Sequence, residues 1–184
     1  MPDLMTERLI IRDLTLEDVE HIIAYSQDPR HRAYEPSEAR TAEAFRDVLR
    51  WVVNTRYDEP RAYFYVGVTL IDDPTRFLGS VHISIRDEQH RQAEVGYSFD
   101  ASAWGKGYCT EAARAMVGYA FDVLGMHRVC ATDIISENIA SVRVAQKLGM
   151  RQEAHHRQAF FFRDRWWDAL TFAILADEWH SANG

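Results

Sequence analysis

Apolar residues in the middle of the chain change from a period of two to a helical period. From Glu94 to Phe99 polar and apolar residues alternate, which predicts a strand. A turn with two glycines, Trp104 to Tyr108, follows this strand. Beyond the turn, apolar residues recur at helical spacing and predict a long helix: Ala113, Met116, Val117, Ala120, Phe121 and Leu124. This helix directs its first unpaired N–H groups toward the turn.

Such a turn is suited to phosphate, because glycine lets a ligand approach the backbone and a helix N-terminus carries partial positive charge. The spacing excludes two nucleotide-binding motifs. A dinucleotide fingerprint needs a third glycine where this chain has Thr110, and the P-loop pattern GxxxxGK[ST] is absent. On this fragment alone, a plain strand-to-helix turn is an equally good interpretation.

The N-terminal third alternates between strand and helix signals. Thr6 to Leu14 predicts a first strand, and Thr15 begins a helix that runs to about Ser26. Residues 28–40 mix prolines and charges without periodicity, which indicates a loop. Ala42 to Tyr57 then predicts a second amphipathic helix.

The remaining elements are strands with one further helix. Two strands lead antiparallel into the Glu94 strand, another follows the long helix, a short helix begins at Asn138, and a pair of strands ends the fold. The predicted strands are Arg61 to Leu70, Phe77 to Arg86, His127 to Ile135, Arg151 to Phe162 and Trp166 to Ala176. These patterns predict an α/β (α+β) fold in one domain, residues 1–184.

Composition narrows the class of protein. With 47% hydrophobic and 27% charged residues, the 184-residue chain is typical of a soluble globular protein long enough to bury a full core. The net charge of −7 argues against a nucleic-acid partner and favours a cationic one, such as an amine. No apolar run reaches the length of a membrane span and no leader peptide is evident, so we expect no membrane partner and a cytoplasmic location.

Metal binding and cysteine chemistry are not expected. Cys109 and Cys130 have a spacing that fits no zinc signature. The adjacent His155 and His156 would point to opposite faces of a strand. Cys109 lies at a helix N-terminus, but no base is paired with it, so we do not expect it to act as a nucleophile.

The order of motifs resembles the acyl-CoA-binding half of the GNAT N-acetyltransferases, in particular the RimJ/RimL-type branch that modifies ribosomal proteins. The segments that carry the resemblance are Ala93 to Tyr97, Trp104 to Tyr108, Thr110 to Ala112, Asn138 to Ser141 and Lys147 to Met150. The resemblance implies a GNAT fold: a mixed, mostly antiparallel sheet of seven strands, flanked by about four helices and splayed at the acetyl-CoA site. One position departs from the pattern, because Ser102 stands where the family usually has Gln or Arg.

The same resemblance implies acetyl-CoA as the acyl donor and suggests where it binds. The pyrophosphate would lie on the turn formed by Trp104, Gly105, Lys106, Gly107, Tyr108, Cys109 and Thr110. The backbone of Tyr97, Ser98 and Phe99 would pair with the pantetheine arm as an added strand does. Asn138 and Ser141, in the first turn of the following helix, would touch pantetheine and the sulfur.

Acetyl transfer to an amine also requires a base and a group that assists the leaving thiolate. Glu94 is our candidate base, although a structural ion pair explains it equally well. Ser141 is the candidate for thiolate assistance, since no Tyr occurs between residues 120 and 184. Some RimL-type enzymes use a Glu on the penultimate strand, but the matching segment here offers Phe160. Gly96 suggests a bulge that would expose a backbone N–H to the thioester oxygen.

The expected activity is therefore N-acetylation by direct attack in a ternary complex. The resemblance favours the α-amine of a protein or peptide as the acceptor. Neutralising such an amine at pH 7 costs only about 1 kcal/mol, against on the order of 4 to 5 for a lysine side chain, so an α-amine needs little help from a base. A small amine, such as an aminoglycoside, polyamine or amino acid, and a non-catalytic acyl-CoA-binding module are the alternatives.

Specificity would lie near Tyr34, Glu35 and Trp51, and the resemblance is compatible with a homodimer. Glu111 is expected to make a structural contact.

Overall fold

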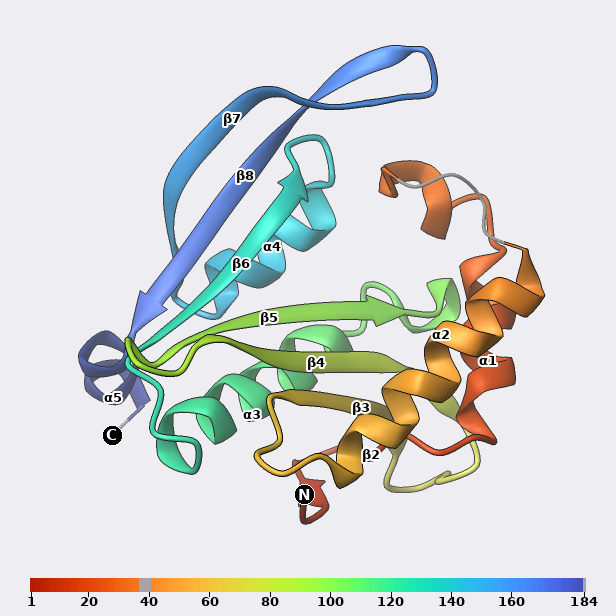
Figure 1. The fold of residues 1–184 in the computed structure, drawn as a ribbon, viewed down its shortest axis with the longest axis horizontal. Coiled ribbons are helices and arrows are strands. Elements are labelled where there is room, and N and C mark those ends of the chain that lie inside the picture. Colours follow the sequence, from red (N-terminus) through yellow and green to blue (C-terminus); the bar gives the residue numbers. More distant parts are fainter. Residues whose placement is uncertain (37–40, 184) are drawn as a thin grey trace.

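One twisted sheet of eight strands organises the part of the chain that the computed structural model describes, residues 1–36 and 41–183 (Figure 1). Its spatial order is β1-β2-β3-β4-β5-β6-β8-β7, and every pairing is antiparallel except that of β5 with β6. The strands are β1 (Leu4–Met5), β2 (Leu9–Asp13), β3 (Tyr63–Leu70), β4 (Phe77–Asp87), β5 (Gln92–Phe99), β6 (Arg128–Ile135), β7 (Arg151–Phe162) and β8 (Arg165–Leu175).

Helices cover both faces of this sheet (Figure 1). They are α1 (Asp18–Ser26), α2 (Ala42–Asn54), α3 (Tyr108–Asp122), α4 (Ile139–Lys147) and α5 (Ala176–Asn183), with short 3₁₀ turns η1 (His31–Tyr34), η2 (Thr55–Tyr57) and η3 (Ala101–Ala103). The main core packs α3 against the strands through residues such as Met116 and Val66, and a smaller core on the opposite face holds α1 and α2 through Ile22 and Leu49. Residues 37–40 of the loop predicted at 28–40 lie outside the described residues.

The GNAT-type, mostly antiparallel fold expected from the sequence is confirmed, with two corrections to the element count. Eight strands replace the expected seven, because Leu4–Met5 adds a short strand beside β2. A fifth helix replaces the expected four, because the last strand ends at Leu175 and Ala176 begins α5. Trp179 anchors α5 on Phe121 of α3, with ring centroids 5.8 Å apart.

The sheet opens into a fork between β5 and β6, as the resemblance implied. The two strands pair only from Gln92 to Glu94, against Arg128 to Cys130. Beyond these residues they diverge (Figure 1). The pairing of β6 with β8 is irregular between Ala131 and Ile134, and Asp133 there adopts φ +55°. The diverging edges leave backbone groups available to a bound molecule.

The bulge expected at Gly96 is wrong. The register of β4 with β5 is continuous from Gly79↔Phe99 to Ile85↔Ala93, and its irregularity comes later, between Ile85 and Asp87. Glycine at position 96 has another cause. A Cβ there would lie 2.2 Å from Cε1 of His82, so only glycine lets this ring lie against the strand.

Candidate active site

The turn before α3 has the backbone geometry expected of a phosphate site. Gly105 and Gly107 adopt φ +73° and +83°, a left-handed conformation that side chains other than glycine rarely tolerate. Glu111 donates its N–H to the carbonyl of Gly107 at 3.0 Å, which is the first bond of the helix. The amides before it therefore point out of the helix end, where its partial positive charge is concentrated.

An N-terminal segment braces this turn from outside. Thr6 Oγ1 and Arg8 Nε donate to the carboxylate of Glu111 at 2.6 and 2.7 Å, and Arg8 Nη1 donates to the carbonyl of Lys106 at 3.0 Å. Burial opposes the charge of Glu111, but these hydrogen bonds prevail and hold its pKa below the usual value. The structural role expected for Glu111 is thus confirmed.

The end of β5 is tied to the same turn. Trp104 donates its indole N–H to the carbonyl of Phe99 at 2.8 Å, so this carbonyl is already engaged. Ser102, the departure from the family pattern, donates its N–H to Asp100 Oδ1 at 2.6 Å within η3. These bonds fix the turn relative to the strand.

Burial settles the chemical state of Cys109. It raises the pKa of the thiol to about 12, so the residue is a neutral thiol at physiological pH. Cys109 and Thr110 belong to the first turn of α3, with their side chains partly buried. The structure therefore offers no activated cysteine nucleophile at this position.

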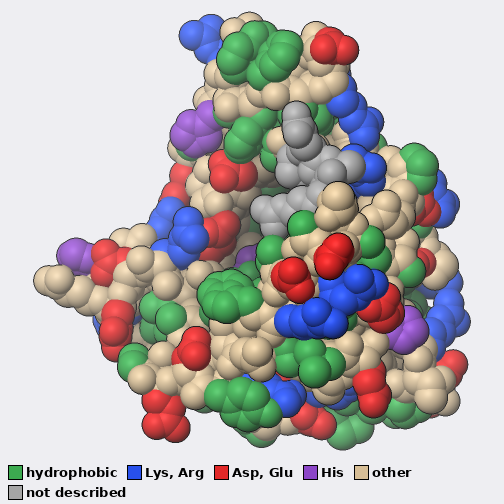
Figure 2. All heavy atoms as spheres, turned by 45° about the vertical axis from the view of Figure 1, so that its right-hand side comes forward, with side chains coloured by type: hydrophobic (Ala, Val, Ile, Leu, Met, Phe, Trp, Pro, Cys, Tyr) green, Lys and Arg blue, Asp and Glu red, His purple; other side chains and the backbone are tan. Residues whose placement is uncertain are grey.

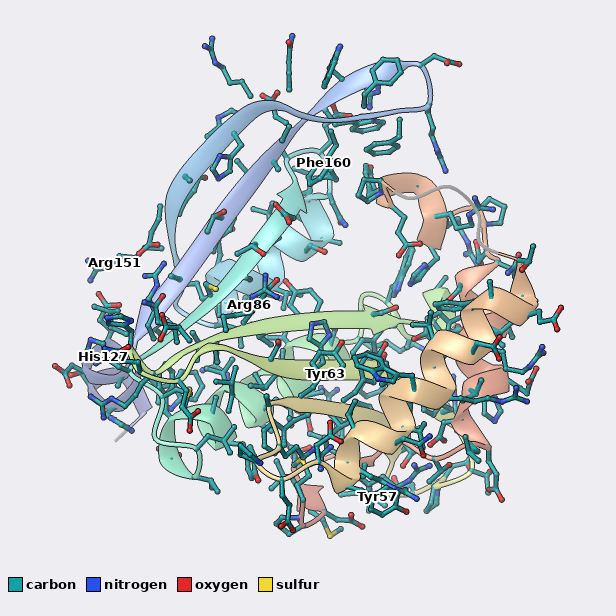
Figure 3. The ribbon with its side chains drawn as sticks, viewed as in Figure 1. Tyr57, Tyr63, Arg86, His127, Arg151 and Phe160 are labelled. Atoms are coloured by element: carbon teal, nitrogen blue, oxygen red, sulfur yellow. The ribbon has the colours of Figure 1, made fainter. Side chains whose placement is uncertain are left out.

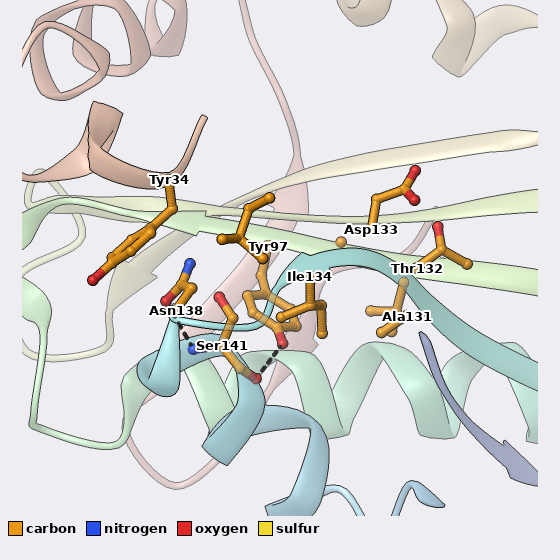
Figure 4. A pocket seen from close by; sticks show the side chains of 11 residues that line it. Tyr34, Tyr97, Ala131, Thr132, Asp133, Ile134, Asn138 and Ser141 are labelled. Carbon is orange, nitrogen blue, oxygen red and sulfur yellow. Dashed lines mark hydrogen bonds between the residues drawn. The ribbon is translucent and has the colours of Figure 1, made fainter. Parts of the chain in front are cut away.

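A pocket occupies the fork between β5 and β6 and brings several predicted residues together (Figure 4). Asn138 caps α4 by accepting the N–H of Ser141 at 3.2 Å, and the hydroxyl of Tyr97 donates to the carbonyl of Ser141 at 3.0 Å. Tyr97 thus fixes the first turn of α4 from across the fork. The pocket is lined by Tyr34, Val95, Gly96, Tyr97, Ala131, Thr132, Asp133, Ile134, Ile135, Asn138 and Ser141.

Glu94 lies at the base of the fork, in the last residue pair that joins β5 to β6. Its side chain is 18% exposed and forms an ion pair with Arg86, Nε to Oε2 3.1 Å. Thr132, which also lines the pocket, donates its hydroxyl to Oε1 at 2.7 Å. Figure 3 shows Arg86 at this fork and Tyr63 farther along the sheet toward α2. The carboxylate is thus held in one position beside the pocket.

An aromatic surface that sequence reasoning missed lies on the same face of the sheet. The His82 ring stacks on Tyr65, with centroids 5.6 Å apart and planes 12° apart, and is tilted against Tyr63 at 5.4 Å. Trp51 of α2 stacks on Tyr63 at 6.3 Å. Burial, and secondarily the charge of Arg86, lower the pKa of His82 to about 4. The glycine at position 96 is the sequence signal for this ring, but reading it needs the strand register.

The turn η1 and the tip of the β7–β8 hairpin meet above the fork. The Tyr34 ring, which lines the pocket, packs edge-on against Trp167 at 6.1 Å, and Arg163 Nη2 donates to the carbonyl of Arg32 at 2.9 Å. On the other side, His31 Nε2 lies 2.8 Å from Ser98 Oγ. Figure 2 shows the surface hollowed between this hairpin, at the top, and the sheet below. We call the contacts of Tyr34 and Arg163 the roof.

The described residues contain no group of three or more His, Cys, Asp or Glu side chains placed to hold a metal ion. None of the helices in residues 1–36 and 41–183 is both long and apolar enough to cross a membrane.

Comparison with known proteins agrees with this geometry. Residues 8–151 match the family model described as acetyltransferase (GNAT) domain. The chain is 30% identical over 175 residues to the uncharacterized N-acetyltransferase YnaD of Bacillus subtilis (strain 168), covering 95% of this chain and 98% of YnaD.

Two solved structures share the fold. The ribosomal-protein-S5-alanine acetyltransferase from Vibrio fischeri superposes with a TM-score of 0.81 at 24% identity, covering 97% of this chain and 99% of that one. The spermidine N-acetyltransferase from Vibrio cholerae, in complex with CoA and spermine, has a TM-score of 0.81 at 21% identity, covering 95% and 99%. At such identities the agreement shows a common fold.

Proposed function

The chain belongs to the GNAT family of N-acetyltransferases, and from that premise we propose that it acetylates the N-terminal α-amine of a protein or peptide, with acetyl-CoA as the donor. The observation that carries this proposal is the fork between β5 and β6. A glycine turn at a helix N-terminus lies beyond the end of β5, and a carboxylate with aromatic neighbours lies on β5 at the base of the fork. Donor and amine can therefore meet in the pocket between them.

In this proposal the donor occupies the α3 turn and the free edge of β5. Its pyrophosphate accepts hydrogen bonds from the amides of residues 105–110. The pantetheine arm follows the backbone from Tyr97 to Phe99, where the bond between Trp104 and the Phe99 carbonyl leaves fewer groups for pairing than expected. The side-chain oxygen of Asn138 caps α4, and its N–H₂ group forms no hydrogen bond with residues 1–36 or 41–183, so this group can bind the ligand.

Glu94 and Ser141 have complementary roles in the proposed chemistry. The neutral amine attacks the thioester carbon, a C–N bond forms, and the C–S bond breaks as the tetrahedral intermediate collapses. Glu94 receives the proton that the amine loses, through a water molecule. The Ser141 hydroxyl, at the pocket wall, donates a hydrogen bond to the departing sulfur, which is protonated from solvent.

A small polyamine is the second candidate acceptor, and one feature favours it. An aromatic surface suited to a cation is formed by Trp51, Tyr63, Tyr65 and His82. Burial raises the pKa of Tyr65, and the nearby negative charge of Glu35 raises it further. A non-catalytic acyl-CoA-binding module is the alternative of a different class. For residues 1–184 we propose a single domain acting in the cytoplasm, and a homodimer is compatible with it.

The test is CoA release from acetyl-CoA against a panel of amines. Short peptides with free Ala, Ser, Met or Thr N-termini are compared with polyamines, aminoglycosides and amino acids. Selective turnover of a peptide, abolished when its N-terminus is blocked, is the expected result. Turnover confined to polyamines would transfer the proposal to the second candidate. Acetyl-CoA binding without turnover on any acceptor would contradict both.

A further inference from the structure

A contact between two strands places His82 against Gly96, a residue that lines the pocket. His82 lies on β4 directly opposite Gly96 of β5. A Cβ on Gly96 would come within 2.2 Å of Cε1, 2.7 Å of Nε2 and 3.0 Å of Nδ1, so the imidazole fills the space of the missing side chain. Because Gly96 lines the pocket between Val95 and Tyr97, the ring borders the place where β5 leaves β6.

Packing fixes the ring and leaves its nitrogens free. Tyr65 stacks on one side of it, and Tyr63 is tilted against it. Neither ring nitrogen of His82 forms a hydrogen bond with another residue in the described part of the chain. His31 Nδ1 also lacks a partner but is completely buried, whereas the nitrogens of His82 are not. A polar atom held in this way is available to a ligand.

The charge state of the ring limits what it can do. Its pKa of about 4, lowered by burial and then by Arg86, keeps it neutral throughout the physiological range. A neutral imidazole has one N–H donor and one lone pair that accepts. Such a ring is too weak a base to take the proton of an ammonium group, but it can accept a hydrogen bond from a neutral amine.

We propose that His82 is a catalytic residue that accepts a hydrogen bond from the attacking amine. This hydrogen bond directs the lone pair of the amine nitrogen toward the thioester carbon. This inference rests on the proposed function. Glu94 lies two residues before Gly96 on β5, on the same face as the ring, and receives the proton through water. Orientation and proton removal are thus divided between an uncharged group and a carboxylate.

The experiment compares His82→Leu, which removes both nitrogens, with His82→Gln, which keeps an amide oxygen able to accept. The control is His21→Leu, since His21 stacks on Phe77 with the same geometry, centroids 5.6 Å and planes 12° apart, but belongs to α1 and not to the strand opposite Gly96. Each variant is measured for kcat and KM with the best amine of the panel, for acetyl-CoA Kd, and for melting temperature.

We expect His82→Leu to lower kcat about tenfold or more, with the acetyl-CoA Kd unchanged, because one positioning hydrogen bond is lost. His82→Gln should recover most of kcat, and His21→Leu should match the wild type. A His82→Leu enzyme with wild-type kcat would overturn the inference while leaving the proposed function intact. Equal losses in both His82 variants, together with weaker acetyl-CoA binding, would show a purely structural role. An inactive wild type would overturn both proposals.

Discussion

At the scale of single residues, Glu94 has two interpretations, a structural ion pair and a catalytic base. Its contacts allow an experiment to distinguish them. Its carboxylate is bonded to Arg86 and to Thr132, so the ion pair expected of a structural residue and the location expected of a base are both present. A structural role of Glu94 depends on its ion pair with Arg86, whereas a base needs only the carboxylate oxygen of Glu94. Substitutions of Glu94 and of Arg86 should therefore change kcat to different extents only if Glu94 accepts the proton.

We expect Glu94→Gln to lower kcat about 100-fold, because the amide cannot accept the proton. Affinity for acetyl-CoA, measured by titration calorimetry, should stay within about twofold, since the glycine turn is unaffected. Arg86→Gln is the matched control, because it breaks the same ion pair and leaves the carboxylate in place. Equal effects of the two substitutions on kcat would show that Glu94 serves only to hold Arg86.

His82 gives the fold a predictable sensitivity to acid. Its pKa is about 4 in the folded protein and 6.5 in the unfolded chain, so the unfolded chain binds more protons as the pH falls from 6.5 to 4. Stability is therefore lost over that window, by up to about 3 kcal/mol from this residue. Urea unfolding at pH 7 and pH 4 should show a smaller acid-induced loss for His82→Gln than for the wild type. Equal losses would contradict the shifted pKa.

At the scale of elements, the glycine turn and α3 form one unit whose backbone conformation supports the proposed phosphate site. Gly107→Val places a branched side chain at φ +83°, and its Cβ would lie 3.3 Å from Arg8 Nη2. We expect the acetyl-CoA Kd to rise at least about tenfold, measured by titration calorimetry, because the amides of the turn move out of register.

A second glycine in the same helix provides the control. A Cβ at Gly118 would meet Trp179 at an ordinary 3.5 Å, and the residue is interior to α3. Gly118→Ala should therefore leave acetyl-CoA affinity unchanged and raise the free energy of unfolding by up to about 1 kcal/mol. Unchanged affinity in Gly107→Val as well would show that phosphate is bound elsewhere.

Elements were predictable from sequence wherever a local signal determines them. The period of apolar residues predicted α3, and Asn138 predicted the start of α4 through its capping oxygen. The contact between His82 and Gly96 was not predictable, because it depends on the register of two strands rather than on spacing along one. For the same reason Gly96 was interpreted as a bulge. The helix α5 was missed because its apolar anchor, Trp179, follows a strand pattern without a break.

At the scale of the whole molecule, the sheet has two arms that meet at the base of the fork. One arm is β1–β5 with α1–α3, and the other is β6–β8 with α4 and α5 (Figure 1). Within the described residues, only the pairing of Gln92–Glu94 with Arg128–Cys130 joins the strands of the two arms. At the opposite end the roof connects them through the ring contact of Tyr34 with Trp167 and the hydrogen bond from Arg163 to Arg32. We therefore expect the roof to affect the proposed acceptor side of the pocket, while the glycine turn lies entirely on one arm.

This arrangement predicts that the acceptor and the donor respond differently when the roof is weakened. Tyr34→Ala removes the edge-on contact with Trp167 and a wall of the pocket, and an aromatic pair is worth about 0.5–1.5 kcal/mol. We expect the KM for the amine to rise several-fold, with acetyl-CoA Kd nearly unchanged, in steady-state and calorimetric measurements. Tyr57→Ala is the control, because Tyr57 is 69% exposed and lies at the far end of α2 from the fork (Figure 3). If Tyr34→Ala weakened the binding of the amine and of acetyl-CoA to the same extent, the roof would instead hold the two arms together. Only a change in the fork itself would alter the binding of the donor.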